Sequence, residues 1–360
     1  MTRIAPGGTI GIFGGGQLGR MTALAAARLG YRCHVFCPEA DSPAAEISAA
    51  ATIAGYDDLE ALDGFCASID VATFEFENVP YEAVARIAAR MPVRPGWEAL
   101  RTSQDRAVEK RFLNSIGLET TCWTEIRSAS DLRQAPCPGI LKTTRFGYDG
   151  KGQVQLQEGF DAETVWAIFG AERGVAEMLV DFSHEVSVIV ARGTDGSVAL
   201  FDVAQNHHRG GILRRTLVPA PVSSSIKAEA QTLAARAAEA LDLVGLLAVE
   251  FFVTRSGQLL ANEIAPRPHN SGHWTQDACG ADQFEQFVRA VAGLPLADPA
   301  RHSDAEMVNL IGDDVHAWPN LLAEPGARLH LYGKHDIRPG RKMGHVNRLS
   351  PKARRKGPEA

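Results

Sequence analysis

The chain opens on a glycine-rich loop that directly follows an apolar segment. Residues 9–21 read TIGIFGGGQLGRM, in which Gly14, Gly16 and Gly19 form the pattern G-x-G-x-x-G. This spacing is typical of a tight turn between a buried strand and a helix whose N-terminus faces a ligand. We therefore predict a strand over 9–13 and a helix over 17–29. The loop alone is a weak signal for the kind of ligand, because dinucleotides and other sugar phosphates can both use such a turn.

Strand and helix patterns continue to alternate up to residue 97. Strand-like segments cover 31–36, the surroundings of Ile53 and VATFEFE (71–77), and a helix is predicted over 57–66. This alternation predicts a parallel sheet with helices on both faces. The segment MPVRPGW (91–97) is rich in Pro and Gly and ends this unit, so residues 1–97 are predicted to be a Rossmann-like α/β domain.

The rest of the chain has a different pattern. After a predicted helix over 103–115, strands dominate, interrupted by helices over 225–243 and near 282–292. We predict an α+β unit of antiparallel hairpins over 98–298, and a small β-rich unit with a basic tail over 299–360. A chain of 360 residues is too long for one compact core, which agrees with two or three domains.

Composition narrows the class of protein. A net charge of -6 and 45% hydrophobic residues describe an ordinary soluble chain without a general attraction for nucleic acid or anionic membranes. The N-terminus has no basic segment followed by an apolar one, so we expect no secretory signal and a cytoplasmic location. The six cysteines are scattered without a C-x-x-C motif, which favours buried free thiols in a reducing compartment. The basic residues Lys352, Arg354, Arg355 and Lys356 are interpreted as a solvated tail.

A hairpin near residue 256 is predicted to oppose two carboxylates. If 256–257 is a two-residue turn, the register places Glu250 opposite Glu263, with Cβ atoms about 5 Å apart. Two ionised carboxylates at that distance repel by ~4 kcal/mol at an effective dielectric of about 20. One is therefore protonated, basic side chains intervene, or a divalent cation bridges them; Mg²⁺ is favoured, with Asn262 as a further oxygen donor. The alternative is a surface hairpin whose solvated acids point apart.

A second hairpin is predicted to turn at 195–196 and to carry polar residues at one end. Its register places Glu185 opposite Asn206, with His208 diagonally on the same face. A lone histidine is more often structural. A carboxylate, an amide and an imidazole together suit sugar hydroxyls or a phosphate better than a core.

The segment ILKTTRFGYDGKGQ (140–153) lies between two predicted strands. Gly147, Gly150 and Gly152 free backbone N–H groups to approach an anion, and Lys142 on the incoming strand can reach phosphate oxygens. The spacing and the absence of a following helix pattern exclude a Walker A loop. Nucleotide phosphates are predicted here; the alternative is a flexible turn.

Two later segments concentrate positive charge in an acidic chain. In APRPHNSGHW (265–274) two prolines restrict the backbone beside Arg267 and aim its guanidinium. The same segment adds the donors His269, Asn270, Ser271 and His273, and YGKHDIRPGRKMGHV (332–346) supplies Lys334, Arg338, Arg341 and Lys342. This charge predicts an anionic ligand other than a nucleotide.

The glycine loop is predicted to hold a sugar phosphate with the help of Glu75. Open α/β sheets bind ligands at the carboxyl ends of their strands, and VATFEFENVP (71–80) ends a neighbouring strand at that edge. Strand alternation brings Glu75 beside the loop, where its oxygens can accept from ribose hydroxyls while the backbone of Gln17 and Leu18 closes on the sugar. The alternative is that Glu75 caps the following helix.

Six segments carry a resemblance to a known family: in chain order GGGQLGRM, TFEFENVP, SQDRAVEKRFL, GYDGKGQ, NEIAPRPHNSGHW and RPGRKMGHVN. They resemble the N5-carboxyaminoimidazole ribonucleotide synthetases, ATP-grasp ligases of purine biosynthesis that use ATP, Mg²⁺ and bicarbonate to carboxylate 5-aminoimidazole ribonucleotide. The resemblance covers nearly the whole chain. It implies a pre-ATP-grasp domain (1–97), an ATP-grasp domain (98–298) with a lid at about 119–180, and a C-terminal β-rich domain (299–360). It also implies the products ADP and phosphate, a carboxyphosphate intermediate and a homodimer.

The resemblance further implies roles residue by residue. Contacts to ATP are expected from Arg106, Lys142, Gly147, Tyr148, Asp149, Gly150, Lys151, Gly152, Gln153, Glu177, Met178, Leu179, Val180, Glu185, His208, Asn262 and Glu263. Catalytic contacts are expected from Asp149, Lys151, Arg267, His269 and Lys342, and contacts to the ribonucleotide from Gly16, Gln17, Leu18, Glu75, Tyr148, Asn270, Lys334 and Arg341. Glu250 and Glu263 would carry Mg²⁺. Members usually extend further beyond GHVN, and many carry Arg where this chain has Lys151, which keeps the charge but loses bidentate geometry.

Two other functions stay open on the sequence alone. A sister ATP-grasp carboxylate–amine ligase or formyltransferase would act on a different amine. An NAD-binding oxidoreductase, or a non-catalytic Rossmann-type sensor, would use the glycine loop itself. Cys37 and Pro38 stand where an acid would grip the ribose 2′-hydroxyl of NAD, although Glu39 is close.

Overall fold

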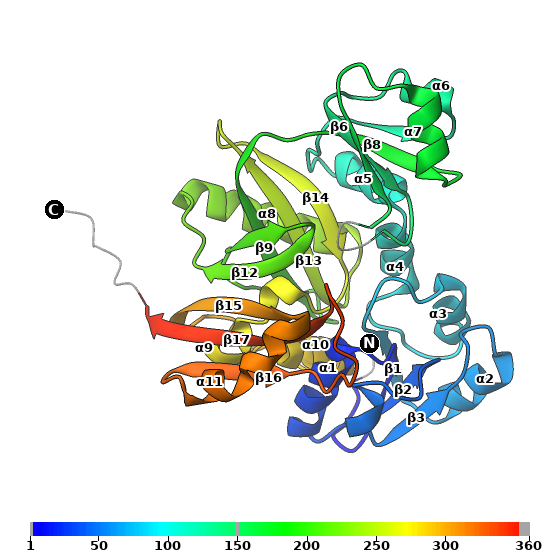
Figure 1. Cartoon of the computed structure of the whole chain (residues 1–360). Coiled ribbons are helices and arrows are strands. Elements are labelled where there is room, and N and C mark those ends of the chain that lie inside the picture. Colours follow the sequence, from blue (N-terminus) through cyan, green and yellow to red (C-terminus); the bar gives the residue numbers. More distant parts are fainter. Residues whose placement is uncertain (1–2, 148–150, 353–360) are drawn as a thin grey trace.

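The N-terminal part of the chain folds around a parallel sheet. The structure is a computed structural model that describes residues 3–147 and 151–352 (Figure 1). Four parallel strands form the sheet in the order β3-β2-β1-β4. They are β1 (Thr9–Phe13), β2 (Arg32–Cys37), β3 (Ala50–Ile53) and β4 (Val71–Phe74). The predicted parallel sheet is confirmed.

Helices cover both faces of this sheet, as predicted. On one face, α1 (Gln17–Arg28) also contacts α10 (Gln283–Ala292) from later in the chain. On the other face, α2 (Leu59–Ala67) and α3 (Tyr81–Ala88) pack over a buried aromatic cluster that includes Phe13, Phe36, Phe65 and Phe74. A short 3-10 helix, η1 (Ala45–Ile47), follows β2. Because Gly30 adopts a φ of +81°, which suits glycine, the chain can turn sharply after α1.

The predicted helix over 103–115 is confirmed over 106–115, but its predicted start is wrong, because two helices meet at Asp105. They are α4 (Trp97–Gln104) and α5 (Arg106–Ser115), separated by Asp105 in an extended conformation. The Asp105 carboxylate accepts from the backbone N–H groups of Ala107 and Val108, so it caps α5. This cap fixes the first turn of α5, where the Arg106 N–H donates to the Thr144 carbonyl at 2.9 Å.

A small antiparallel sheet forms the upper part of Figure 1, in the order β5-β8-β6-β7. Its elements are β5 (Trp123–Ile126), α6 (Ala129–Leu132), β6 (Gly139–Thr143), β7 (Gln153–Leu156), α7 (Ala162–Phe169) and β8 (Gly174–Met178). Both helices pack against the sheet through a small buried cluster around Leu141 and Leu156. This sheet is the segment expected to be the lid.

The largest sheet has nine strands, in the order β14-β13-β9-β11-β12-β15-β17-β16, with β10 paired to β9. Its first strands are β9 (Phe182–Arg192), β10 (Val198–Leu200), β11 (Ala204–Arg209), β12 (Ile212–Val218), β13 (Gly245–Thr254) and β14 (Leu259–Ala265). Helix α8 (Ser224–Ala240) covers one face and α10 the other. The 3-10 helix η2 (Asn270–Gly272) and α9 (Thr275–Ala278) connect β14 to α10.

The C-terminal strands continue this sheet. Strand β15 (Ser303–Ile311) pairs with β12, and β17 (Lys342–Pro351) and β16 (Ala327–Leu331) follow. The 3-10 helix η3 (Gly312–Ala317) and α11 (Trp318–Ala323) lie between β15 and β16. The β-rich character of this part is therefore confirmed, and its strands are hydrogen-bonded to those of the preceding unit. The division at residue 299 stays a prediction.

Both predicted hairpins have a longer turn than expected and still oppose the predicted residues. In the β13–β14 hairpin, Thr254 N–H donates to Gln258 O and three residues form the turn, so the first pairs are shifted by one residue. A β-bulge after Glu250 reverses the shift, and Glu250 lies opposite Glu263 as predicted. The β9–β11 pair behaves alike: β10 and β11, which follow the turn, are separated by residues 201–203, and Glu185 lies opposite Asn206 as predicted.

All six cysteines are free; Cys122 is exposed and Cys137 half-buried, so the prediction that all six thiols are buried is wrong for these two. Within 3–147 and 151–352, the helices are too short or too polar to cross a membrane.

Candidate active site

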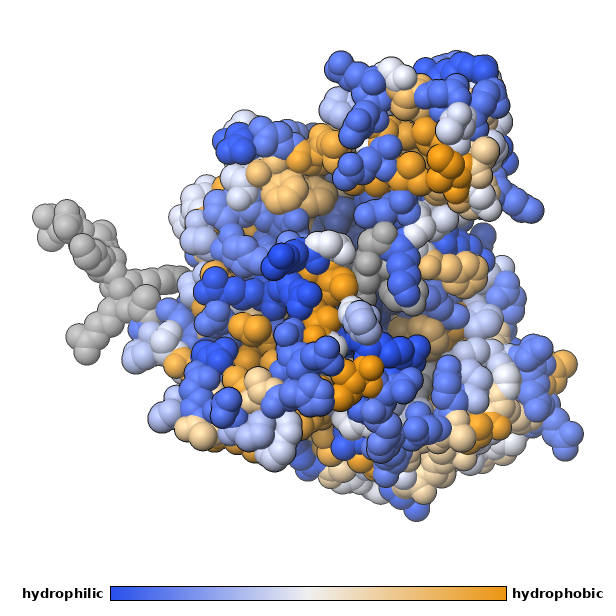
Figure 2. All heavy atoms as spheres, viewed as in Figure 1, coloured by the Kyte–Doolittle hydropathy of each residue, from blue (hydrophilic) through white to orange (hydrophobic). Residues whose placement is uncertain are grey.

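A cavity of about 650 Å³ lies where the glycine loop, the lid and the large sheet meet. Hydrophilic residues cover most of the surface on the side shown in Figure 2, and apolar side chains gather on the lid. The predicted residues that line the cavity are Gln17, Leu18, Glu75, Arg106, Lys142, Gly147, Lys151, Gln153, Glu185, His208, Glu250, Asn262, Glu263, Arg267, His269, Asn270 and Lys342. Residues from all three parts of the chain are thus brought together.

Glu75 follows β4 and caps the helix of the glycine loop. Its two oxygens accept from the backbone N–H groups of Gly16 at 2.5 Å and Gly19 at 2.8 Å. Burial raises the pKa of Glu75, and these two amides partly offset that effect. The alternative, in which Glu75 caps the helix that follows it, is wrong, because its oxygens cap α1. Each oxygen keeps a further lone pair, so the predicted contact with ribose hydroxyls stays a prediction. Glu75 still lines the cavity.

This cap limits how the G-x-G-x-x-G loop can bind a phosphate. A helix N-terminus attracts a phosphate through its unpaired N–H groups and its positive dipole end. In this chain a carboxylate already occupies two of those groups and neutralises that end. A side chain at Gly16 would also collide with Glu75, since a Cβ there would lie 2.5 Å from its Oε1.

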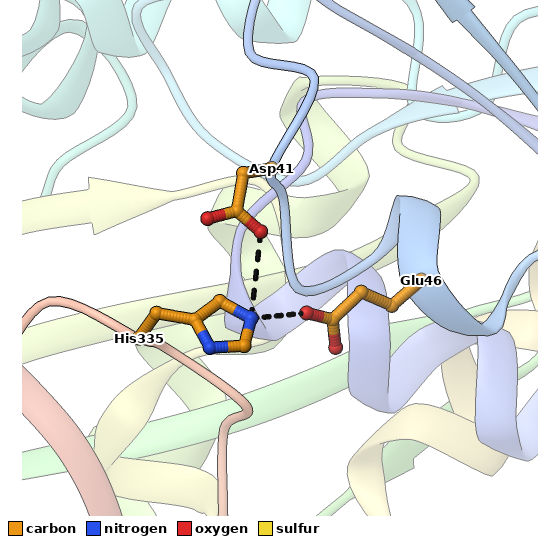
Figure 3. Close-up of side chains that lie close together, drawn as sticks. All are labelled: Asp41, Glu46 and His335. Carbon is orange, nitrogen blue, oxygen red and sulfur yellow. Dashed lines mark hydrogen bonds and ion pairs between the residues drawn. The ribbon is translucent and has the colours of Figure 1, made fainter.

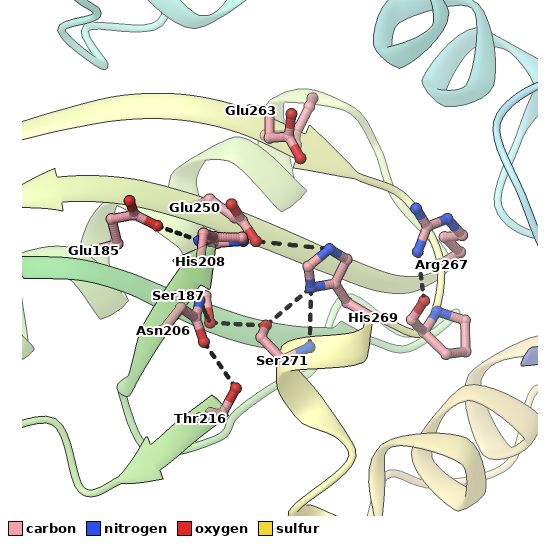
Figure 4. A network of polar contacts seen from close by, with 12 residues as sticks. Glu185, Ser187, Asn206, His208, Thr216, Glu250, Glu263, Arg267, His269 and Ser271 are labelled. Carbon is pink, nitrogen blue, oxygen red and sulfur yellow. Dashed lines mark hydrogen bonds and ion pairs between the residues drawn. The ribbon is translucent and has the colours of Figure 1, made fainter. Parts of the chain in front are cut away.

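The opposed carboxylates lie at the centre of the cavity. Glu250 on β13 and Glu263 on β14 face each other, with His269 nearby (Figure 4). One ligand atom from each of these three residues lies within 4.8 Å of the other two. Burial, and then the charge of Glu263, raise the pKa of Glu250 to about 7. The Arg106 guanidinium, 3.6 Å from Glu263, compensates only part of the repulsion. Opposed carboxylate oxygens that line a cavity, with part of their charge uncompensated, suit Mg²⁺.

Sequence reasoning missed a third carboxylate, Glu109 of α5. Its Oε1 accepts from the Ile264 N–H at 2.6 Å, directly beside Glu263. Burial and the charge of Glu263 raise the pKa of Glu109 to about 8. The signal was available, because Glu109 lies three residues after Arg106 and therefore on the same face of a helix.

A buried ion pair positions Lys142. Its Nζ lies 3.0 Å from Glu177 Oε2, and Lys110 Nζ lies 3.4 Å from Glu177 Oε1. Burial alone raises the pKa of Glu177, but the charges of Lys110 and Lys142 outweigh it, so that pKa lies below its ordinary value. Lys110 was missed. None of the residues 177–180 lines the cavity in the described parts of the chain, and Met178 and Leu179 are exposed. The expected place of these four residues around adenine therefore stays a prediction.

The glycine segment of the lid is described in part. Tyr148, Asp149 and Gly150 lie outside the described residues. The Gly147 carbonyl accepts from Arg106 Nη2 at 3.1 Å, which ties this segment to α5. Gly152 adopts a φ of +70° and does not itself line the cavity, whereas the neighbouring Lys151 and Gln153 do.

The segment after β14 brings Arg267, His269 and Asn270 into the cavity. Arg267 Nη2 lies 2.5 Å from Glu77, another residue that sequence reasoning missed. Among the described residues, neither polar atom of the buried Asn270 amide has a hydrogen-bond partner, although the side chain lines the cavity. Such an orphaned amide fits a ligand-binding role. Burial, Arg267 and Lys342 hold the pKa of His269 well below its usual value.

The polar residues of the second hairpin divide into two groups. Glu185 hydrogen-bonds His208, and both line the cavity as predicted. Burial lowers the pKa of His208, but the hydrogen bond to Glu185 and nearby carboxylates raise it above its ordinary value. Asn206 is different: it is buried and bonds Ser187 and Thr216, so the expectation that it faces a ligand was wrong.

Of the basic residues in 332–346, only Lys342 lines the cavity within the described parts of the chain. Lys334 donates to the carbonyl of Lys342 at 2.9 Å. Arg341 donates to the carbonyl of Asp336 at 2.8 Å, and Arg338 pairs with the Asp336 carboxylate. The expected contacts of Lys334 and Arg341 with a ligand stay predictions.

His335 of the same loop meets the N-terminal domain at the surface. Its Nε2 lies 3.0 Å from Glu46 and 3.4 Å from Asp41 (Figure 3). Arg20 also reaches Glu46, at 3.0 Å. Because a guanidinium already competes for this carboxylate, the exposed group is an ion-pair cluster that ties the loop to the N-terminal domain.

Three protein families match consecutive parts of this chain. Residues 8–104 match the ribonucleotide synthetase preATP-grasp domain, 111–284 the ATP-grasp domain, and 305–356 the phosphoribosylaminoimidazole carboxylase C-terminal domain. The chain is 50% identical to the N5-carboxyaminoimidazole ribonucleotide synthase of Brucella melitensis, over 98% of this chain and 99% of that protein. It is 43% identical to the enzyme of that name from Bacillus subtilis, over 95% and 92% of the two chains.

Solved structures give the same result. A structure of N5-carboxyaminoimidazole ribonucleotide synthetase in complex with ADP is similar with a TM-score of 0.94 and 41% identity, covering 97% of this chain and 94% of that one. The Aspergillus clavatus enzyme, in complex with ADP and 5-aminoimidazole ribonucleotide, is similar with a TM-score of 0.88 and 30% identity, covering 96% and 94%.

Proposed function

We propose a role for each part of the cavity, starting from the fact that the chain belongs to the N5-carboxyaminoimidazole ribonucleotide synthase family. It is an ATP-grasp ligase that carboxylates 5-aminoimidazole ribonucleotide to N5-carboxyaminoimidazole ribonucleotide in purine biosynthesis, at the expense of ATP. An oxidoreductase that binds NAD, a sensor and a ligase for a different amine are thereby set aside. Bicarbonate as the source of the carboxyl group, Mg²⁺, and the roles of individual residues are the proposal.

The observation that carries the proposal is the opposed pair Glu250 and Glu263 in a cavity that Arg106, Lys142 and Arg267 also line. These carboxylates would hold Mg²⁺, which neutralises phosphate charge when bound. Arg106 and Lys142 lie where they can bind ATP phosphates, and the lid segment 147–153 would close over them. Glu185 and His208 would contact the ribose of ATP, and residues 177–180 its base.

The reaction divides into two group transfers. A bicarbonate oxygen attacks the γ-phosphorus of ATP, the bond to the ADP oxygen breaks, and carboxyphosphate and ADP result. The exocyclic amine of the ribonucleotide then takes the carboxyl group, while phosphate leaves and the amine loses a proton. Arg267 and Lys342 would neutralise the charge of carboxyphosphate, and His269 would help to orient it, from the side of the large sheet. Asp149 and Lys151 would act from the lid.

The ribonucleotide would occupy the side of the cavity next to the glycine loop. Gly16, Gln17 and Leu18 present the start of α1 there, and Glu75 fixes it. The orphaned amide of Asn270 faces the same cavity. Tyr148, Lys334 and Arg341 complete the proposed set.

The proposal includes a cytoplasmic homodimer. Six free cysteines agree with a reducing compartment. Light scattering on the purified protein measures the oligomeric state.

The most direct test is the dependence of ATP hydrolysis on the ribonucleotide. Phosphate release from ATP in bicarbonate buffer is expected to need 5-aminoimidazole ribonucleotide, because the cavity joins the two sites. The measurement is phosphate release with and without the ribonucleotide, with inosine monophosphate as a control ligand. Equal release in all three samples would count against the proposal.

Glu75→Gln is expected to raise the KM for the ribonucleotide roughly tenfold to a hundredfold, the effect of losing a hydrogen bond to a charged group worth ~1.5–3 kcal/mol. A glutamine amide cannot accept from both Gly16 and Gly19, so the start of α1 moves. The KM for ATP should stay nearly unchanged. Asp70→Asn is the matched control, because Asp70 accepts from a backbone N–H at the other end of β4. A loss of affinity for ATP, with an unchanged KM for the ribonucleotide, would show that the ribonucleotide does not bind at the glycine loop.

A further inference from the structure

The imidazole of His269 is held by one residue, Ser271, on its inner side. Nδ1 lies 2.9 Å from Ser271 Oγ and 3.3 Å from the Ser271 backbone nitrogen. A backbone N–H can only donate a hydrogen bond, so it favours an unprotonated Nδ1, but at 3.3 Å it is the longer of the two contacts and the Ser271 hydroxyl is the closer partner. In a neutral imidazole the proton is then on Nε2, which faces the cavity and Glu250.

A chain of buried hydrogen bonds continues behind Ser271 (Figure 4). Ser187 Oγ on β9 donates to Ser271 Oγ at 2.8 Å, and Asn206 Nδ2 on β11 donates to Ser187 Oγ at 3.0 Å. Thr216 Oγ1 on β12 donates to Asn206 Oδ1 at 3.0 Å. All four side chains are at most 3% exposed. Three strands of the large sheet are thus linked to one ring nitrogen.

The chain has a fixed direction. The Asn206 amide nitrogen can only donate, so the Ser187 oxygen accepts and its own proton goes on to Ser271. The Ser271 oxygen then accepts in turn, and its proton is directed at His269 Nδ1. Reversing either serine hydroxyl would leave a buried donor facing a donor, which native structures avoid.

The backbone of His269 is fixed by a separate residue. Gln283, at the start of α10 and fully buried, accepts from the His269 N–H and donates to the His269 carbonyl, both at 2.9 Å. The ring is therefore held by the serine chain and the backbone by Gln283, so His269 has one orientation.

We propose that Thr216, Asn206, Ser187 and Ser271 are positioning residues that fix His269 as a hydrogen-bond donor to the cavity. The donor is Nε2–H, and it would point at an anionic oxygen of the carboxyl-bearing intermediate. This rests on the proposed function in placing that intermediate beside His269. One consequence is that His269 does not ligate a cation, so the group Glu250, Glu263 and His269 contributes two carboxylates and no imidazole nitrogen.

The test is to measure the tautomer and the rate in the same variants. In full-length protein with ¹⁵N-labelled histidine, the wild type should show His269 with protonated Nε2 and unprotonated Nδ1; the spectrum of His269→Gln identifies the signals. In Ser187→Ala the Ser271 oxygen loses its donor and can accept from Nδ1–H, so both tautomers should appear. Thr216→Val breaks the chain one step further away and guards against a folding defect in Ser187→Ala.

The rate should follow the tautomer. Ser187→Ala is expected to lower kcat about tenfold, as when roughly one molecule in ten keeps the donating form, with the KM values for ATP and ribonucleotide within about twofold of wild type. Ser183→Ala is the matched control, because Ser183 lies on the same strand and bonds a strand carbonyl at 3.0 Å.

Three results would overturn the proposal: a proton on Nδ1 in the wild type, an unchanged tautomer and kcat in both chain variants, or mixed tautomers with an unchanged kcat. The spectra need no substrate. A wild type that lacks ribonucleotide-dependent ATP hydrolysis therefore refutes the proposed function, whereas the spectra decide the role of the chain.

Discussion

Glu263→Gln is expected to lower the rate of carboxylation by at least about 10²-fold, because one of the two carboxylates proposed to hold Mg²⁺ is lost and phosphate charge would be left uncompensated. The protein should fold. Glu263 lies opposite Glu250 and beside Glu109, so a neutral side chain removes two repulsions, which offset the loss of its ion pair with Arg106. Thermal unfolding without metal should therefore occur at the same temperature as in the wild type, or higher.

The measurement is the steady-state rate over a range of Mg²⁺ concentrations. Asp181→Asn is the matched control, because Asp181 is an exposed carboxylate that pairs with Arg255 at the turn of the same hairpin. It should keep wild-type activity. A fully active Glu263→Gln enzyme would refute the metal assignment, and a loss of activity together with a lower unfolding temperature would point to a structural role.

Glu177→Gln is expected to destabilise the protein by ~3–5 kcal/mol, since removing one partner of a buried ion pair leaves the other charge uncompensated. Here two ammonium groups lose their carboxylate, and the Lys110 side chain is only 1% exposed. The pKa of Glu177 lies below its ordinary value, so the carboxylate is ionised and stabilising at neutral pH. That contribution is lost only as the pH falls through the lowered pKa.

Thermal unfolding at pH 7 checks this expectation, with a decrease in Tm of about 6–20 °C. The matched control is Glu163→Gln. Glu163 pairs with Arg133 at 2.7 Å, but both side chains are at least 60% exposed. Such a pair is worth at most about 1 kcal/mol. If both variants unfold at the same temperature, the buried group does not stabilise the fold.

The hairpin that carries Glu250 and Glu263 shows how far local pattern can reach. The alternation of the two strands and the Gly257 turn predicted the correct pair of carboxylates. The predicted turn was one residue too short, and a β-bulge then restored the register. A bulge depends on how the strand packs on its neighbours, so an alternation pattern does not reveal it. The pair Glu250 and Glu263 was thus predicted correctly, although the pairs between the turn and Glu250 were predicted one residue out of register.

Other features depend on contacts between distant segments. Glu177 and Lys110 lie on different elements, and nothing near either residue in the sequence indicates that they meet. Glu75 was correctly placed beside the glycine loop, because strand ends in a parallel sheet share an edge. Its hydrogen bonds to Gly16 and Gly19 were not foreseen, since they depend on how closely the loop approaches. These contacts could not be predicted from the sequence because they depend on the distances between packed segments and not on the residue types alone.

The pairing of β12 with β15 limits how this protein can be recombined with its relatives. Arg215 to Val218 bond Ala305 to Val308 backbone to backbone, and Lys342 enters the cavity from the strand beyond. A chimaera that takes its last strands from another enzyme must therefore match the twist and the register of β12. A poor match would leave an open sheet edge, which promotes aggregation. It would also displace Lys342 and its positive charge from the cavity. The C-terminal strands are accordingly not an exchangeable module, and useful crossover points lie in the segments that join the sheets.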